Sequence, residues 1–168
     1  MALPNMKSAP GPVARLLILA CSAKKRPDPG AMPAIERYSG PLWTSLRKML
    51  PGLQPADRPR ILVLSAKYGF IAADQPIPDY NLAMDASRAI AIAADELQRN
   101  RLSALVRGAG EIHIAGGTLY RQCGLEAFAG LRIGGEQFPN ITHTPPGLSI
   151  GYQRQALRRW LLRQPAAL

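Results

Sequence analysis

Short apolar runs that alternate with segments of helical periodicity constrain the fold of this chain more than any other feature. These runs are five or six residues long, rich in leucine and isoleucine, and typical of buried β-strands. They are RLLILA (15–20), RILVL (60–64) and EIHIA (111–115), and FPNIT (138–142) is a weaker fourth. Strands that alternate with helices predict parallel βαβ units, with helices on both faces of one sheet.

The segments between these runs carry helix signals. Pro41 suits the first position of a helix, and Asp85 suits the cap of another. The apolar positions are Leu42, Leu46, Met49 and Leu50 in the first helix, and Ile90, Ala94 and Leu97 in the second. Further helices are expected at about 118–128 and 149–162. The sequence therefore predicts one α/β domain (15–164) around a four-stranded parallel sheet, with a flexible N-terminal segment (1–14) and a C-terminal tail (165–168).

Charge indicates the class of partner. Lys and Arg number 21 against 11 Asp and Glu, which gives a formal net charge of +10. A polyanion is favoured, because each phosphate that is neutralised releases condensed counterions. The basic residues gather after the first strand (Lys24, Lys25 and Arg26) and in the last predicted helix (Arg154, Arg158, Arg159 and Arg163). A solvated basic face without a ligand is the alternative.

Other compositional features exclude several classes. The two cysteines, Cys21 and Cys123, cannot form a disulfide framework, supply an iron–sulfur cluster or match the spacing of a zinc site. The apolar run at 16–20 is too short for a signal peptide core or a membrane span. We therefore expect a cytoplasmic protein with no cofactor, no metal, no membrane association and no obligate protein partner.

Four loops are expected at one edge of the sheet, because ligands of open α/β sheets bind beyond the carboxyl ends of the strands. The loops are CSAKKRPDPG (21–30), SAKYGFIAADQPIPDYN (65–81), GGTLY (116–120) and HTPPGLS (143–149). Together they supply hydroxyls, aromatic rings, carboxylates, cations and a histidine. The sequence therefore predicts that the ligand site lies among these loops.

Several residues in these loops have two interpretations. The Gly116–Gly117 pair permits a tight turn but also exposes backbone N–H groups to an anion. Tyr68 and Tyr80 suit either packing or the stacking of a base. His143 is either a turn residue or a catalytic group. Cys21 is expected to be a small buried residue rather than a nucleophile.

Two sets of motifs resemble known families. CSAKK, RYSGPLW, LSAKYGFIAADQPIPDYNLAM and AGGTLYRQ resemble the YaaA-like superfamily, over roughly residues 15 to 125. That superfamily includes peroxide-stress proteins and domains associated with deazaguanine transglycosylases. SGPLWTSLRKML and THTPPGLS are similar to a helix start and a late DNA-inserting loop of the uracil-DNA glycosylase fold. His143 is followed by Thr144 and Pro145 rather than Pro-Ser, and the usual water-activating motif after the first strand is absent.

These resemblances imply a three-layer sandwich like that of uracil-DNA glycosylase, and a substrate in which a nucleobase is attached to a sugar. We expect a DNA glycosylase that cleaves the N-glycosidic bond of a base, in particular a modified one, and leaves an abasic site. Such an enzyme could defend a bacterium against phages with modified DNA. The alternatives are a non-catalytic DNA-binding stress-response protein and a base-exchange or nucleotide-processing enzyme. The net charge disfavours a small substrate.

Cleavage of this bond needs a carboxylate near the sugar and a hydrogen-bond donor near the departing base. The catalytic candidates are Asp79 and Asp28 for the sugar, and Lys67 and His143 for the base. The candidates for holding the flipped base are Cys21, Ser22, Ser65, Tyr68, Tyr80, Asn81, Gly117 and Tyr120. The candidates for binding DNA are Lys24, Lys25, Arg26, Arg154 and Arg158, with Leu148 as a wedge.

Overall fold

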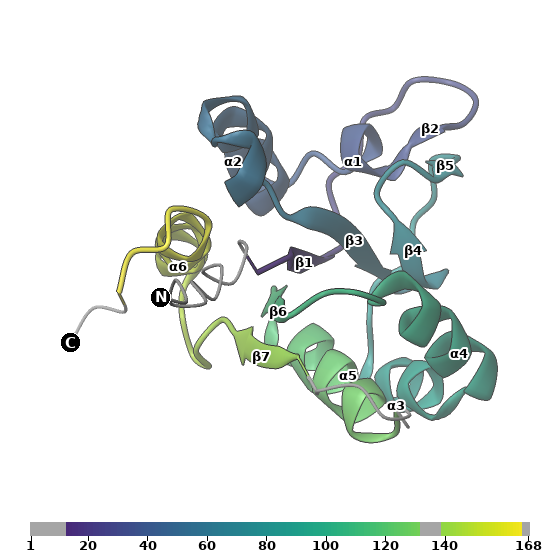
Figure 1. Cartoon of the computed structure of the whole chain (residues 1–168). Helices are drawn as coiled ribbons and strands as arrows, with labels where there is room; N and C mark the ends of the chain where they lie inside the picture. The colour runs from purple at the N-terminus through teal and green to yellow at the C-terminus, as the bar shows by residue number, and fades with distance from the viewer. Residues whose placement is uncertain (1–12, 132–138, 166–168) are drawn as a thin grey trace, which may run out of the picture.

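A five-stranded, mostly parallel sheet forms the centre of the domain (Figure 1). The computed structural model describes residues 13–131 and 139–165. The strands of the sheet are β1 (Arg15–Ala20), β3 (Arg60–Ser65), β4 (Gly69–Ala72), β6 (Glu111–Ala115) and β7 (Asn140–His143). Their order is β4-β3-β1-β6-β7, in which β3, β1, β6 and β7 run parallel and β4 is antiparallel to β3. The predicted mixed α/β class is confirmed.

The central strand β1 explains the first apolar run. All six of its residues are buried, because β3 and β6 pair with it on either side and helices cover both faces. Leu17, for example, pairs with Ile61 of β3 and with His113 of β6. A strand that is buried on both faces needs a continuous apolar run rather than an alternating one.

Helices lie on both faces of the sheet (Figure 1). On β6, His113 stacks on Trp160 of α6 (Ile150–Leu161), whereas the adjacent Ile114 packs against Gly124 of α5 (Thr118–Ala129). Because successive residues of a strand point to opposite faces, α5 and α6 cover opposite faces. α2 (Pro41–Met49) packs beside α6, and α3 (Ala86–Ala94) packs beside α5. None of the helices in the described ranges is both long and apolar enough to cross a membrane.

A small two-stranded sheet and a short helix lie outside the central sheet. The small sheet consists of β2 (Met32–Pro33), paired antiparallel with β5 (Pro76–Ile77), and the short helix is α1 (Ala34–Arg37). Two 3₁₀ turns, Leu50–Gly52 and Pro55–Asp57, follow α2. The fully buried Arg37 donates hydrogen bonds to the carbonyl groups of Arg26, Asp28, Gly30 and Ile77, and so fixes the loop after β1 against β5.

The structure corrects the predicted strands. The sheet has a fifth strand, β4, because Gly69 adopts a positive φ of 67° that turns the chain back along β3. Phe70 and Ile71 are therefore buried, although they lie in the segment expected to be a loop. Gln98 protects the outer edge of β4 by accepting from the backbone N–H of Phe70 and donating to the carbonyl of Tyr68. The fourth predicted strand is found at 140–143, and residue 138 lies outside the described residues.

The structure has two helices after Asp85, where the sequence predicts one. Asp85 caps α3 as predicted, but α3 ends at Ala94, and Asp95 caps α4 (Glu96–Leu105) beside β4. Ile90 and Leu97 are 62% and 76% exposed, so they do not form the predicted apolar face. The smaller Ala89 and Ala93 are buried instead.

The remaining differences concern the end of the chain. Arg163 lies beyond the end of α6, with a positive φ of 53°, and pairs with Asp57 and Glu111. It is therefore not part of the basic face of the last helix. Residues 1–12 of the predicted N-terminal segment and 166–168 of the predicted tail lie outside the described residues.

Candidate functional site

The loops after β1 and β3 are joined at the carboxyl edge of the sheet. The backbone N–H of Cys21 donates to the carbonyl of Leu64 (3.0 Å), and that of Ala66 donates to Cys21 Sγ (3.4 Å). Trp43 of α2 donates from its indole N–H to the carbonyl of Ala20 (2.9 Å). These bonds hold two of the four predicted loops side by side and leave Cys21 buried.

A network of hydroxyl groups centres on Tyr80. Its oxygen lies 2.9 Å from Ser65 Oγ and 2.6 Å from the hydroxyl of Tyr38. Ser65 Oγ also accepts hydrogen bonds from the backbone N–H groups of Lys67 and Tyr68, both at 3.1 Å. Because those two bonds occupy both lone pairs of Ser65, its own hydrogen is donated to Tyr80. The network therefore fixes the position of the Tyr80 ring.

The tyrosines of this network are neutral. Burial raises the pKa of Tyr38 to about 12, and burial likewise raises the pKa of Tyr80 further above its usual range. The ring of Tyr80 meets those of Tyr68 and Tyr38 edge to face, with centroids 5.4 and 6.4 Å apart. Tyr38 also stacks on Trp43. Tyr38 is fully buried and was not predicted as a site residue, although the RYSGPLW segment that contains it was one of the resembling motifs.

Two lysine amines lie over these rings. Lys25 Nζ is 4.2 Å from the centroid of Tyr80 and 5.7 Å from that of Tyr38. Lys67 Nζ is 5.3 Å from Tyr68 and 5.4 Å from Tyr80. Burial lowers the pKa of Lys25, although nearby Cys21 and Asp79 act in the opposite direction. The two lysines thus place positive charge over the aromatic cluster of Tyr38, Tyr68 and Tyr80 at the carboxyl edge of the sheet.

An open cavity adjoins the Lys25–Tyr80 contact. Its volume is about 360 Å³, and it is lined by Ala23, Lys25, Asp79, Tyr80 and Asn81. The exposed Asp79 and Asn81 flank Tyr80 in the chain. The structure therefore brings together one predicted catalytic residue, two predicted base-binding residues and one predicted DNA-binding residue.

A second, smaller cavity of about 230 Å³ lies beside Cys21, between the ends of β1 and β6 and the starts of α2 and α6. The predicted residues that line it are Cys21, Ser22, Gly117 and Tyr120. The Tyr120 hydroxyl lies 3.2 Å from Cys21 Sγ, and burial raises the pKa of Tyr120. Gly116 and Gly117, at the end of β6, differ in the space available for a side chain. A Cβ at Gly116 would overlap Ala20, whereas a Cβ at Gly117 would meet nothing within 4 Å.

Asp28 is engaged elsewhere. Its two carboxylate oxygens accept from Arg26 at 3.1 and 3.0 Å, and this hydrogen bonding lowers the pKa of Asp28. Both side chains are exposed. Asp28 and Arg26 therefore pair with each other on the loop that Arg37 holds, and neither lines the cavity of Asp79.

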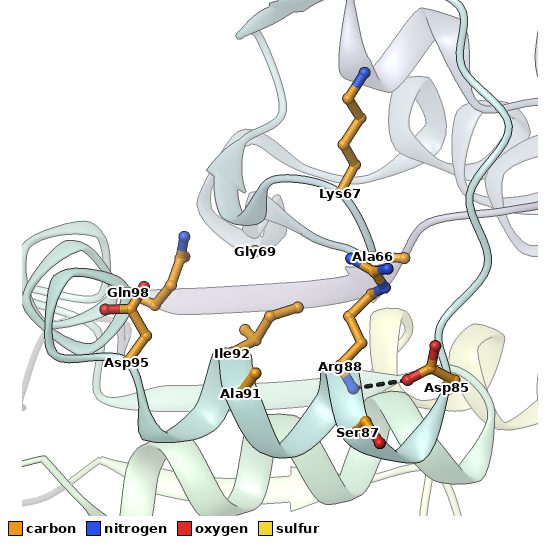
Figure 2. A pocket seen from close by; sticks show the side chains of 10 residues that line it. All are labelled: Ala66, Lys67, Gly69, Asp85, Ser87, Arg88, Ala91, Ile92, Asp95 and Gln98. Atoms are coloured by element: carbon orange, nitrogen blue, oxygen red, sulfur yellow. Dashed lines mark hydrogen bonds between the residues drawn. The ribbon is translucent and has the colours of Figure 1, made fainter.

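Lys67 lies at the border of another cavity, of about 460 Å³, between the turn after β3 and helices α3 and α4 (Figure 2). The guanidinium group of Arg88 extends from α3 to Ala66, while Asp85 accepts from the backbone N–H of Arg88 (2.7 Å). Figure 2 shows that the amine of Lys67 points away from α3 and α4. Lys67 therefore directs its charge toward Tyr68 and Tyr80 rather than into this cavity.

His143 and Leu148 lie apart from Asp79. Together with His113 and Trp160 they line a cavity of about 560 Å³ beside α6. The Nδ1 atom of His143 lies 2.9 Å from the carbonyl oxygen of Thr144, to which it donates. β7, which ends at His143, is separated from β3 by two strands, so the structure does not bring His143 and Lys67 together.

The predicted DNA-binding cations occupy two places. Lys24, Lys25 and Arg26 lie in the loop after β1, and Arg154 and Arg158 are exposed on α6. Arg154 donates to Ser45 Oγ of α2 (2.8 Å).

Within residues 13–131 and 139–165, no group of three or more His, Cys, Asp or Glu side chains could hold a metal ion. The chain matches no family model, no curated protein and no solved structure.

Proposed function

We propose that this protein is a DNA glycosylase that removes a nucleobase, in particular a modified one, and leaves an abasic site. The observation that carries the proposal is the 360 Å³ cavity in which Asp79, Asn81 and Tyr80 lie beside the amine of Lys25. A departing base leaves positive charge on the sugar and takes negative charge with it. The cavity offers the Asp79 carboxylate for the first and the Lys25 amine for the second.

The proposal assigns roles to Asp79 and Asn81, which line the cavity, and to Lys67, which lies outside it. Asp79 stabilises the sugar cation and positions the attacking water. Asn81 can donate and accept hydrogen bonds at the edge of a flipped base. Lys67, over the outer side of the aromatic cluster, stabilises the departing base. Asp79 is preferred to Asp28, because the oxygens of Asp28 are already paired with Arg26.

The fold is compatible with this proposal. Four parallel strands with helices on both faces support an architecture like that of uracil-DNA glycosylase, with β4 as an added edge strand. The cavity of His143 and Leu148 lies beside α6, where Leu148 would act as a wedge in the DNA rather than as part of the base pocket. We further propose a cytoplasmic role, in defence against phages with modified DNA.

The proposal is tested with a panel of DNAs that are unmodified, contain uracil, or come from phages with hypermodified bases. Released base is identified by mass spectrometry, and abasic sites are detected by alkaline cleavage. Asp79→Asn should abolish release while DNA binding is retained. Asp74→Asn, an exposed carboxylate change five residues earlier, is the matched control and should release base as the native protein does.

Two other outcomes would replace the proposal. The net charge of +10 also suits a protein that binds DNA without chemistry. Tight, salt-sensitive binding with no base released from any DNA would support that function. Turnover of free nucleosides that is indifferent to salt would instead support a base-exchange or nucleotide-processing enzyme.

A further inference from the structure

Backbone pairing with the segment around Tyr38 fixes the position of Lys25. It forms an antiparallel bridge with Tyr38, and its neighbours extend this pairing. The backbone N–H of Arg26 donates to the carbonyl of Arg37 (2.8 Å), and that of Ser39 donates to the carbonyl of Lys24 (3.0 Å). A lysine on such a segment loses little further freedom when its side chain acts on a substrate, which favours reaction.

The side chain of Lys25 is half-buried against aromatic rings. Its amine lies over the face of Tyr80 and 3.4 Å from the carbonyl oxygen of Ala23. Within the described residues Lys25 forms no ion pair. Burial lowers its pKa, so a larger fraction of the amine is neutral at a given pH than for a solvated lysine. A neutral amine has the free electron pair that a nucleophile needs.

A carboxylate shares the cavity with this amine. Asp79 lines the same 360 Å³ space as Lys25, and its charge acts on the Lys25 amine. Lys67 is the rival amine, because it lies over the same Tyr80 ring. Lys67, however, does not line the cavity of Asp79, and Figure 2 shows its amine directed away from Asp85 and Asp95.

An amine beside a carboxylate is suited to abasic DNA, in which the ring-opened sugar carries an aldehyde at C1′. The electron pair of Lys25 Nζ would add to C1′, and uptake of a proton from solvent with loss of water would give a protonated imine. The Asp79 carboxylate would then take a proton from C2′. The C2′–H electron pair would form the C2′=C3′ bond, and the 3′ phosphate would leave with the C3′–O pair. Hydrolysis of the imine by water would restore Lys25.

From this arrangement we propose that the protein is also an abasic-site lyase, in which Lys25 forms an imine with the sugar aldehyde and Asp79 assists strand cleavage. The inference rests on the proposed function, because the substrate of the lyase is the product of the glycosylase. It adds a covalent intermediate and a second bond cleavage that a simple hydrolytic glycosylase lacks.

Borohydride reduction tests the proposal without knowledge of the base. The native protein is incubated with an oligonucleotide that holds one abasic site, and sodium borohydride then reduces the imine to a stable amine. A protein–DNA adduct should appear on a denaturing gel, and peptide mapping should place it on Lys25. Lys25→Arg keeps the charge and should reduce the adduct by about tenfold or more. Lys48→Arg, on the exposed side of α2, is the matched control and should not change it.

The outcomes separate this inference from the proposed function. Release of base without an adduct on abasic DNA overturns the lyase and leaves the glycosylase intact. An adduct mapped to Lys67 or to another lysine overturns the role of Lys25. An adduct on Lys25 together with a cleaved strand supports the lyase, and the base-release assay then decides separately whether the protein makes its own abasic sites. Mapping on the native protein does not depend on whether a variant folds.

Discussion

The hydroxyl groups of Tyr38 and Tyr80 lie 2.6 Å apart, although 42 residues separate them in the chain. Tyr38 belongs to the segment between α1 and α2, and Tyr80 to the loop after β5. Tyr38 also forms the backbone bridge with Lys25, so this contact connects the partner segment of Lys25 to the loop that contributes Asp79 to the candidate cavity. The geometry of that cavity therefore depends on a hydrogen bond between residues that are distant in sequence.

Tyr80→Phe should destabilise the fold while the aromatic ring stays in place. The change leaves the hydroxyl of the fully buried Tyr38 without its partner and removes the bond to Ser65. A loss of about 1–3 kcal/mol in the free energy of unfolding is expected, measured by urea denaturation. Tyr152→Phe removes a hydroxyl from a tyrosine that is 61% exposed and should have little effect. Equal effects of the two changes would contradict the proposed network.

Gly116→Ala and Gly117→Ala should differ strongly, although the two glycines are adjacent. Gly116 has a φ of 145°, and an added Cβ would overlap the side chain of Ala20 in the central strand. Gly117 precedes α5 with an ordinary φ and open space around its Cβ position. Gly116→Ala should cost about 2 kcal/mol or more, and Gly117→Ala less than about 1 kcal/mol, in thermal or urea unfolding. Similar costs would show that the tight approach to β1 does not constrain this turn.

His113 should make the fold sensitive to acid. Burial lowers the pKa of His113 to about 4, and the charges of His143 and Arg15 act in the same direction. The neutral imidazole packs under Trp160, whereas the unfolded chain binds a proton below a pH of about 6.5. The contribution of the neutral His113 to the free energy of unfolding is therefore complete above pH 6.5. It is lost as the pH falls toward 4, by about 3 kcal/mol in total.

The measurement is the free energy of unfolding against pH for the native protein and His113→Phe, which keeps an aromatic ring but cannot titrate. Between pH 6.5 and 4 the native protein should lose more stability than the variant. The chain has two histidines, so the exposed His143 provides the control. His143→Gln should keep most of the native dependence, because burial is the largest cause of the low pKa of His113. A curve for His113→Phe that runs parallel to the native curve would rule out His113 as the titrating group.

The sequence predicts the parallel sheet because a strand buried on both faces needs an unbroken apolar run, as β1 has. It does not predict β4, because that strand is four residues long and its glycine start is typical of a loop. The loops at the carboxyl edge were predicted, but strand order decides which of them are neighbours. Lys67 follows β3 and His143 ends β7, and two strands separate β3 from β7. The two residues therefore do not share one site. Tyr38 was missed because its partner is distant in the chain.

The basic face of α6 should govern the salt dependence of DNA binding. Arg154 and Arg158 are exposed one helical turn apart, and Arg154 is oriented by Ser45. If each neutralises one phosphate, Arg154→Ala with Arg158→Ala should weaken binding on all sequences. The slope of log K against log salt should then decrease in magnitude by about 1.8, because each phosphate contact on duplex DNA contributes about 0.9.

A matched double variant separates this local effect from net charge. Arg101→Ala with Arg107→Ala also removes two positive charges, but these exposed residues lie on α4 and in the turn between α4 and β6. α4 packs against α3 and β4, whereas α6 packs against α2 and β6, so these two charges are not part of the α6 face and the salt slope should remain close to the native value. An equal decrease of the slope in the two double variants would mean that the overall charge of the protein, rather than the α6 face, attracts the DNA. A native slope in the Arg154 and Arg158 double variant would mean that the basic face of α6 does not contact the DNA.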